Sequence, residues 1–197
     1  MRNQILEVSR AEFLQVGFEK ATMRRIAQLA GVSTGAIYRY FPDKTSLFEE
    51  LVAVPAKELK EQFEANGKRM DMTLRENITA YRQWVPDEPE VLVGYIYQHF
   101  DVFKLLLCRA KGTTYEGYVD SLIEIETQAT LRFISYLRTA GIVTHDIDEE
   151  LVHITVSAEF AGILEPIAHD MPKEQAIRYI LILEEFYSAG WKKILRL

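Results

Sequence analysis

Residues 22–48 read TMRRIAQLAGVSTGAIYRYFPDKTSLF, and this stretch decides the fold. Thr22 and Ser33 are residue types that cap helix N-termini, and each precedes a short helical pattern, the first to about residue 29 and the second to about residue 40. Gly31 between them accepts the left-handed backbone of a tight turn. Ala27 is small enough to let two helices cross closely. The stretch therefore predicts a helix-turn-helix.

The second helix of this motif would present small and hydrogen-bonding groups to solvent. A helix that begins with small residues can bring its N-terminus close to bases and phosphates. DNA binding is one interpretation of this pattern. The other is a helical hairpin whose second helix is merely polar and exposed, and the spacing alone does not choose between them.

Cap and stop signals recur along the rest of the chain, and no alternation typical of strands appears. We expect an all-α fold of nine to ten helices. Asp43 and Asp148 can cap helices that begin directly after them, and Asn66-Gly67 predicts the end of the first of these. Capping boxes at 73–76 and 113–116 predict two further helix starts.

The charge of the chain is unevenly distributed. The 197 residues carry a net charge of −6, which argues against a protein that binds nucleic acid over its whole surface. Residues 1–48, however, hold seven basic and four acidic side chains. A locally basic segment joined to an acidic remainder indicates a nucleic-acid module attached to another domain.

Other classes of protein are disfavoured by what the sequence lacks. We find no apolar leader at the N-terminus and no run near the ~18 apolar residues that span a bilayer, so we expect a cytoplasmic protein with no membrane partner. Cys108 is the single cysteine and lies in an apolar run, which predicts a buried thiol. The four histidines lack metal-ligand spacing, and no nucleophile elbow or phosphate loop is visible. We expect no metal, no cofactor and no enzymatic activity.

The opening stretch resembles the DNA-binding domain of the TetR/AcrR family of transcriptional regulators. The shared positions are Gly17-Phe18, Thr22, Ile26-Ala27, 30–33 (Ala-Gly-Val-Ser), Tyr38, Tyr40-Phe41, Lys44 and Leu47-Phe48. The resemblance covers roughly residues 2–50, and beyond them only the helical layout and length agree. It implies an N-terminal three-helix helix-turn-helix domain over 1–50, followed by a helical ligand-binding, regulatory and dimerisation domain over 51–197.

The resemblance also implies DNA-contacting residues. They are Thr22, Arg24, Ser33, Thr34, Gly35, Ala36, Tyr38, Arg39, Tyr40 and Lys44. Thr34 and Ala36 suit readout of thymine methyl groups, and Arg39 suits a guanine or a phosphate. Lys44 matches a phosphate-binding lysine, so Lys44→Ala should weaken binding to every sequence and flatten its salt dependence. Phe41, Leu47 and Phe48 are expected in the core.

In the family the last two helices form the dimer interface, and the middle helices enclose a small-molecule pocket. The expected interface residues are Ser157, Ala158, Ala161, Gly162, Ile180, Leu183, Phe186 and Tyr187. The expected pocket residues are Trp84, Tyr95, His99, Phe103, Tyr118 and Glu126. Aromatic rings beside a carboxylate suit a cationic or mixed amphipathic ligand, although aromatic residues at helical spacing also suit an ordinary core.

The resemblance implies a ligand-responsive regulator, most often a repressor, that binds a palindromic double-stranded DNA operator as a homodimer and leaves it when an unknown small-molecule effector binds. Two alternatives stay open. One is a helical enzyme or carrier in which residues 23–42 form only a structural hairpin. The other is a regulator that has lost its ligand response.

Overall fold

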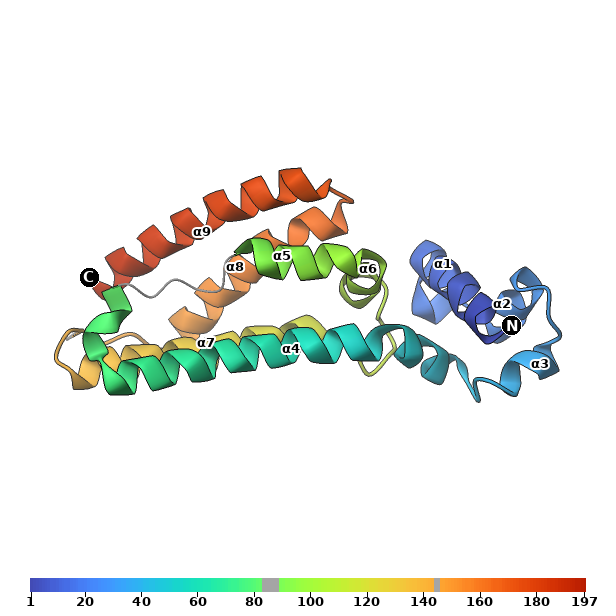
Figure 1. The fold of residues 1–197 in the computed structure, drawn as a ribbon, viewed down its shortest axis with the longest axis horizontal. Helices are drawn as coiled ribbons and strands as arrows, with labels where there is room; N and C mark the ends of the chain where they lie inside the picture. Colours follow the sequence, from blue (N-terminus) through green and yellow to red (C-terminus); the bar gives the residue numbers. More distant parts are fainter. Residues whose placement is uncertain (83–88, 144–145) are drawn as a thin grey trace. The chain divides into compact units, whose positions relative to one another are not determined.

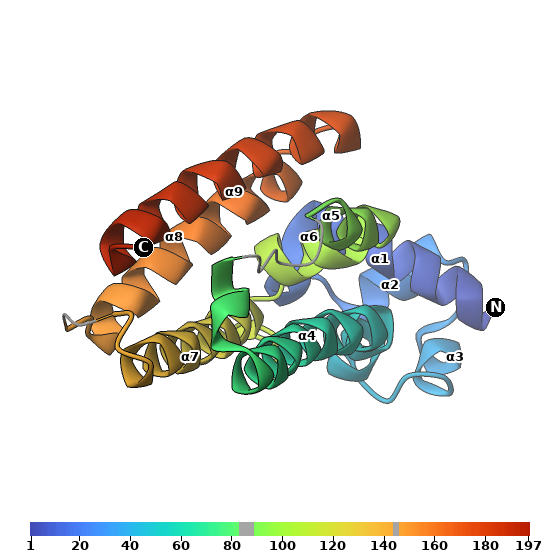
Figure 2. The ribbon, with the colours of Figure 1, turned by 60° about the vertical axis from the view of Figure 1, so that its left-hand side comes forward.

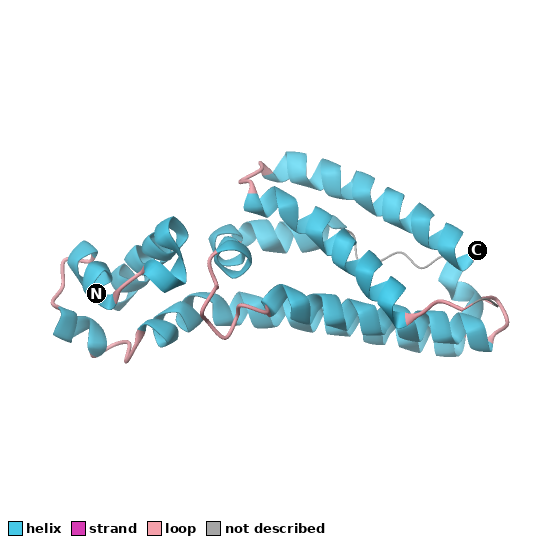
Figure 3. Cartoon of the chain, turned by 180° about the vertical axis from the view of Figure 1, so that it is seen from behind, coloured by secondary structure: helices cyan, strands magenta, loops and turns pink. Residues whose placement is uncertain are grey.

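The computed structural model describes residues 1–82, 89–143 and 146–197, which are helical nearly throughout and contain no strand (Figure 1; Figure 3). This confirms the expected all-α fold. The elements are α1 (Arg2–Lys20), α2 (Met23–Leu29), α3 (Thr34–Tyr38), α4 (Lys44–Glu76), the 3-10 helix η1 (Ile78–Arg82), α5 (Pro89–Gln98), α6 (Phe100–Cys108), α7 (Tyr118–Thr139), α8 (Glu149–Ala168) and α9 (Lys173–Leu195).

The chain forms two compact units. The first combines Met1–Leu59 with His99–Val119, and the second combines Lys60–Gln98 with Asp120–Leu197. α6 and the turn after it therefore pack with the N-terminal helices, although they lie far from them in sequence. The sequence suggests a domain boundary near residue 50, between a DNA-binding domain and a regulatory domain. That boundary stays a prediction.

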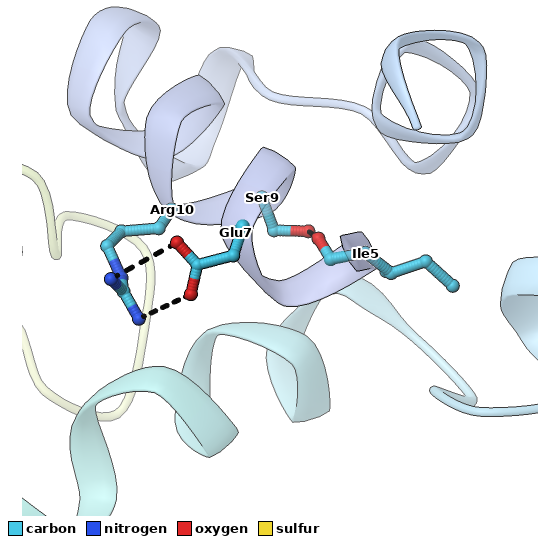
Figure 4. A network of polar contacts seen from close by, with 4 residues as sticks. All are labelled: Ile5, Glu7, Ser9 and Arg10. Atoms are coloured by element: carbon cyan, nitrogen blue, oxygen red, sulfur yellow. Dashed lines mark hydrogen bonds and ion pairs between the residues drawn. The ribbon is translucent and has the colours of Figure 1, made fainter. Parts of the chain in front are cut away.

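α1 packs one face into the first unit and carries a buried hydroxyl with a partner on the same helix. Ile5 and Phe13 are fully buried. The buried Ser9 hydroxyl donates a hydrogen bond to the carbonyl of Ile5, one turn earlier, at 2.6 Å (Figure 4). On the same helix Arg10 pairs with Glu7, with Nη2 and Oε1 3.3 Å apart. The buried hydroxyl thus costs little, because a helix carbonyl accepts its proton.

Three phenylalanines form the centre of the first unit. The ring centroids of Phe13 and Phe48 lie 5.4 Å apart, as do those of Phe18 and Phe48, both pairs edge to face. Such pairs add about 0.5–1.5 kcal/mol each beyond the area they bury. These two ring contacts pack α1 against the first turns of α4. Phe41 and Leu47 are buried as well, which confirms the core placement expected for Phe41, Leu47 and Phe48.

α4 is longer than the sequence predicts, because it runs through Asn66-Gly67 to Glu76. Gly67 is buried in the helix interior, and a β-carbon there would lie 3.4 Å from the Cβ of Ala129 on α7. The glycine therefore permits close contact between helices instead of ending one. The second half of α4 and α7 lie side by side, and the Nε of Arg132 bonds Asp71 Oδ2 at 3.0 Å (Figure 1; Figure 2).

Neither predicted capping box begins a helix. Thr73 lies inside α4, where its hydroxyl donates to the carbonyl of Arg69 at 2.9 Å. The Thr113 hydroxyl donates to the carbonyl of Ala110 at 2.6 Å within a turn, and α7 begins only at Tyr118. Cys108, expected to be buried, is exposed at the end of α6.

α8 and α9 pack against each other in the second unit (Figure 2). Asp148 caps α8 as predicted, accepting from the Leu151 N–H at 2.7 Å. By length and composition α8 could cross a membrane, with a mean hydropathy of 1.3, and the described part of the chain holds a second such span only if α5 and α6 count as one bent span. The buried core helix of a soluble protein passes the same test.

Candidate nucleic-acid interface

The helix-turn-helix forms as the sequence predicts. The Thr22 hydroxyl accepts a hydrogen bond from the Arg25 N–H at 3.2 Å and so caps α2. Ile26 and Ala27 are almost fully buried where α2 meets α3. Gly31 has φ of +67°, the left-handed conformation that the turn requires. These contacts fix the angle at which α3 leaves the turn.

The first turn of α3 is exposed to solvent. The Ser33 hydroxyl accepts from the Ala36 N–H at 3.2 Å, and Ile37 anchors the helix in the core with no exposed surface. Thr34 and Gly35 are exposed, and a β-carbon at Gly35 would meet nothing within 4 Å. α3 ends at Tyr38, earlier than the predicted residue 40. Its first turn is therefore open to close approach by a ligand such as a DNA duplex.

Most of the predicted DNA-contacting residues are exposed together on α2, α3 and the segment that follows. The exposed members are Thr22, Arg24, Ser33, Thr34, Gly35, Tyr38, Arg39 and Tyr40. Ala36 is an exception, because it is only 7% exposed and its methyl group packs into the core. Ala36 therefore has little exposed surface for the expected methyl contact, and that contact stays a prediction.

Lys44 is the second exception, because its ammonium group is occupied within the protein. Nζ donates to the carbonyls of Phe18 at 2.6 Å, Ala21 at 3.0 Å and Glu19 at 3.3 Å, and it lies 4.2 Å from the centroid of the Phe18 ring. Burial lowers the pKa of Lys44, and the charge of Glu19 opposes that shift. An ammonium group has three donors, and all three are used. The phosphate contact stays a prediction, whereas the structure shows Lys44 holding the end of α1.

Sequence reasoning missed two polar residues on the exposed side of α2. Arg25 and Gln28 are both exposed, and Arg25 Nη1 donates to Gln28 Oε1 at 3.5 Å. The available signal was their spacing, since Arg24, Arg25 and Gln28 all fall on the helix face opposite Ile26 and Ala27. Arg25 adds a third exposed guanidinium to those of Arg24 and Arg39.

The residues expected in an effector pocket do not come together within one unit. His99, Phe103 and Tyr118 belong to the first unit, whereas Tyr95 and Glu126 belong to the second. Phe103 is 2% exposed, and the buried Tyr118 hydroxyl donates to the carbonyl of Ala56 at 2.9 Å. Trp84 lies outside the described residues. The pocket stays a prediction.

Three helices of the second unit carry half-buried carboxylates that interact electrostatically. Burial raises the pKa of Glu126 on α7, and the charge of Arg132 opposes that shift. Burial, followed by the negative charges of Glu126 and of Glu184 on α9, raises the pKa of Glu159 on α8 to about 7. The sequence signal for Glu159 was its place three residues after the buried Val156.

The expected dimer residues fall into three groups by exposure. Ala158, Ala161 and Phe186 are exposed, Phe186 by 68%. Ile180 is buried, so it belongs to the core of the unit and not to an open face. Ser157, Gly162, Leu183 and Tyr187 are half-buried. A β-carbon at Gly162 would lie 3.2 Å from Leu183 Cδ1, so these two positions set the approach of α8 to α9.

Further apolar side chains are exposed on α8 and α9. Leu181 and Ile182 belong to the surplus of apolar residues that the sequence of the last helix shows, whereas sequence reasoning missed Leu151, Ile154 and Tyr179. With Ala158 and Ala161, the residues Leu151 and Ile154 follow the spacing of one helix face, as do Tyr179, Ile182 and Phe186 on α9. We call these two rows the α8–α9 outer face. Rows of exposed large apolar side chains are typical of surfaces that bind a partner, and the dimer interface stays a prediction.

A capped helix pair, a glycine turn and a second helix with an exposed first turn, followed by Arg39, together define a helix-turn-helix of the kind that binds DNA. Residues 5–51 match the family model described as bacterial regulatory proteins, tetR family. The transcriptional repressor AcnR of Corynebacterium glutamicum is 41% identical over 171 residues, which span 85% of this chain and 81% of AcnR. The chain belongs to the TetR family of transcriptional regulators.

Other relatives agree with this assignment. The probable acrEF/envCD operon repressor of Escherichia coli K12 is 27% identical over 170 residues, covering 83% of this chain and 74% of that protein. Among solved structures, NalD, the secondary repressor of the MexAB-OprM multidrug efflux pump in Pseudomonas aeruginosa, superposes with a TM-score of 0.56 at 19% identity, over 93% of both chains. SmeT, the repressor of the Stenotrophomonas maltophilia efflux pump SmeDEF, gives 0.55 at 16% identity, covering 96% of this chain and 89% of SmeT. Both show the same fold.

Proposed function

We propose that this chain is a cytoplasmic repressor that binds a palindromic operator as a homodimer and is released by a small-molecule effector bound in the region 51–197. The observation that carries the proposal is the open first turn of α3, where Thr34 and Gly35 are exposed and Arg39 follows one turn later. AcnR and the acrEF/envCD regulator are both named as repressors, which supports the same sign of regulation here.

Selection from a random library of DNA duplexes tests the DNA-binding part. The wild-type chain should enrich one palindromic sequence, and its binding to that duplex should weaken as salt rises. Thr34→Ala or Arg39→Ala should change which bases are enriched, because base contacts specify the sequence. Arg138→Ala, an exposed site of the second unit, is the matched control. If the wild type enriches nothing, the chain is not a sequence-specific regulator.

The dimer part of the proposal rests on the α8–α9 outer face. Phe186 is 68% exposed and Ile154 is 58% exposed. Such large apolar side chains would be more favourably placed in an interface between two subunits than on the surface of an isolated one. Two copies that bury this face would form a four-helix interface. Dimers that carry a helix-turn-helix read half-sites about 34–36 Å apart. The family resemblance implies the same arrangement.

Sedimentation analysis tests the dimer. Phe186→Glu should convert the dimer to a monomer, because it places a charge in the buried apolar contact. Met72→Glu is the matched control, since Met72 is 64% exposed but lies on α4, away from the α8–α9 outer face. A monomeric wild type, or a Phe186→Glu variant that remains dimeric, would contradict this interface.

The effector part rests on Glu126, a half-buried carboxylate whose pKa is raised by burial, in a unit that also carries aromatic residues. A partly buried carboxylate combined with aromatic rings would suit a cationic amphipathic molecule. A thermal-shift titration with tetraphenylphosphonium should stabilise the wild type, and Glu126→Gln should reduce that stabilisation. Glu124→Gln, an exposed neighbour on α7, is the control. Equal shifts in all three proteins would remove Glu126 from any effector site.

A further inference from the structure

α1 contains a break that its own backbone does not repair. Gly17 has φ of +81° and ψ of 162°, outside the helical range. In an uninterrupted helix the Phe18 N–H would donate to the carbonyl of Leu14. At the break both groups are left without their helical partners. A buried backbone group without a partner costs free energy comparable to a lost hydrogen bond, so another part of the chain must satisfy them.

Arg109 satisfies both groups. Its backbone carbonyl accepts from the Phe18 N–H at 3.2 Å, and its side-chain Nε donates to the Leu14 carbonyl at 2.8 Å. The side-chain stem lies along the break, with Cδ 3.8 Å from where a β-carbon of Gly17 would stand. Arg109 therefore replaces the missing hydrogen bond of α1 with two hydrogen bonds of its own, one to Leu14 before the break and one to Phe18 after it.

Arg109 is itself held firmly by α6. It follows the last residue of that helix, and its N–H donates to the carbonyl of Leu105 at 2.9 Å. Leu105 has no exposed surface, and Leu106 is 3% exposed. α6 also packs directly on α1 within the first unit. The backbone of Arg109, from which the guanidinium extends, is thus held in place by α6.

The short turn of α1 beyond the break leads directly into the DNA-reading helices. It ends at Lys20, and Thr22 caps α2 two residues later. Lys44 binds the carbonyls of this turn from the start of α4. Arg109 from α6 and Lys44 from α4 therefore hold the terminal part of α1, and a cation is favourable at this end of a helix. The direction of this turn fixes where α2 begins.

We propose that Arg109 is a positioning residue for DNA recognition, which sets the orientation of the helix-turn-helix by bridging the break in α1. The inference rests on the proposed function, because it assigns Arg109 a role in operator reading without any contact to DNA. A residue of this kind differs from a phosphate-binding arginine. It should affect the fit to one operator and leave the general attraction to DNA unchanged.

The test compares Arg109→Met, Arg109→Lys and the control Arg138→Met, whose wild-type arginine pairs with the exposed Asp146 in the second unit. The DNA probes are the duplex selected by the wild type and a scrambled duplex. We expect Arg109→Met to lose roughly 3- to 30-fold in affinity for the selected duplex, the range found for residues that act on a site without touching its ligand. Arg109→Lys, which keeps one donor for Leu14, should lose less.

Two further readouts separate positioning from simpler roles. Affinity for the scrambled duplex and the salt slope should stay at wild-type values, because no phosphate contact is removed. A salt slope that falls with the affinity, or an equal loss on both duplexes, would make Arg109 a phosphate contact and overturn the proposal. So would an Arg109→Met variant that binds the selected duplex as tightly as Arg138→Met does.

Amide hydrogen exchange tests the bridge without DNA. In Arg109→Met the amides of Phe18 and Arg25 should exchange faster than in Arg138→Met, because the turn after the break loses its support. Unchanged exchange at both amides would overturn the inference. If the wild type selects no duplex, the proposed function fails, whereas the exchange measurement still decides whether Arg109 holds this turn.

Discussion

Replacing Glu159 by glutamine should stabilise the protein at neutral and alkaline pH and leave it unchanged in acid. Glu159 lies on α8 in the interior of the second unit, where burial and then the charges of Glu126 and Glu184 raise its pKa from 4.5 to about 7. Below pH 4.5 the carboxyl is neutral in the folded and the unfolded chain alike, so it contributes nothing to the pH dependence there.

The sign of the effect follows from the two pKa values. Between pH 4.5 and about 7 the unfolded chain loses the proton while the folded chain retains it, so stability falls as the pH rises. Above that range the folded chain carries a buried charge, and the whole loss is present. A pKa raised by this amount corresponds to about 3 kcal/mol in the free energy of unfolding. Glutamine has no proton to lose, so Glu159→Gln does not suffer this loss.

Urea unfolding at fixed protein concentration measures the difference between the two proteins. At about pH 4 it should be near zero, and at about pH 8 Glu159→Gln should be more stable by up to about 3 kcal/mol. Plotting the difference in unfolding free energy against pH removes the contributions of groups common to both proteins. Glu126 is the exception, because its own pKa is raised and it interacts with Glu159. Glu150→Gln, at an exposed site in the first turn of the same helix, should show no such rise. A difference that is constant with pH, or larger in acid, would refute the reasoning.

Further predictions concern four other positions. Lys44→Met should weaken binding to the selected duplex without changing the salt slope, because the ammonium donors of Lys44 bind backbone carbonyls. A salt slope smaller by about one would instead show that Lys44 contacts a phosphate. Gly31→Ala should lower the free energy of unfolding by about 1–2 kcal/mol, because φ is +67° there, whereas Gly35→Ala should leave stability intact and lower operator affinity. Gly162→Val should destabilise the protein by about 1–3 kcal/mol in thermal melts through overlap with Leu183.

The helix-turn-helix could be predicted because all its signals are local. Thr22 and Ser33 cap helices that begin beside them, and Gly31 needs only its own backbone conformation. The buried Ile26 and Ile37 lie within the same short stretch. When neighbouring residues decide a structure, the pattern of a single sequence contains most of the information.

The features that could not be predicted depend on contacts between distant residues. Asn66-Gly67 has the local pattern of a helix end, but the close approach of α7 at Ala129 gives Gly67 a different use. Glu159 looks like one of many helix carboxylates until α7 and α9 enclose it. Arg109 lies 95 residues from Leu14, and nothing near it in the sequence shows that it fills a break in α1.

Contacts within the protein also reduce the charge that can face DNA. Of the seven basic side chains in residues 1–48, Arg2 pairs with Glu50, Arg10 pairs with Glu7, and Lys44 binds carbonyls. The exposed cations that remain are Lys20, Arg24, Arg25 and Arg39. If each of these four neutralises one phosphate, log affinity should fall with log salt at a slope of about −3.6 per subunit, or about −7 for a dimer. A slope near −13, the value for all seven cations in both subunits, would mean that the internal pairs open when DNA binds.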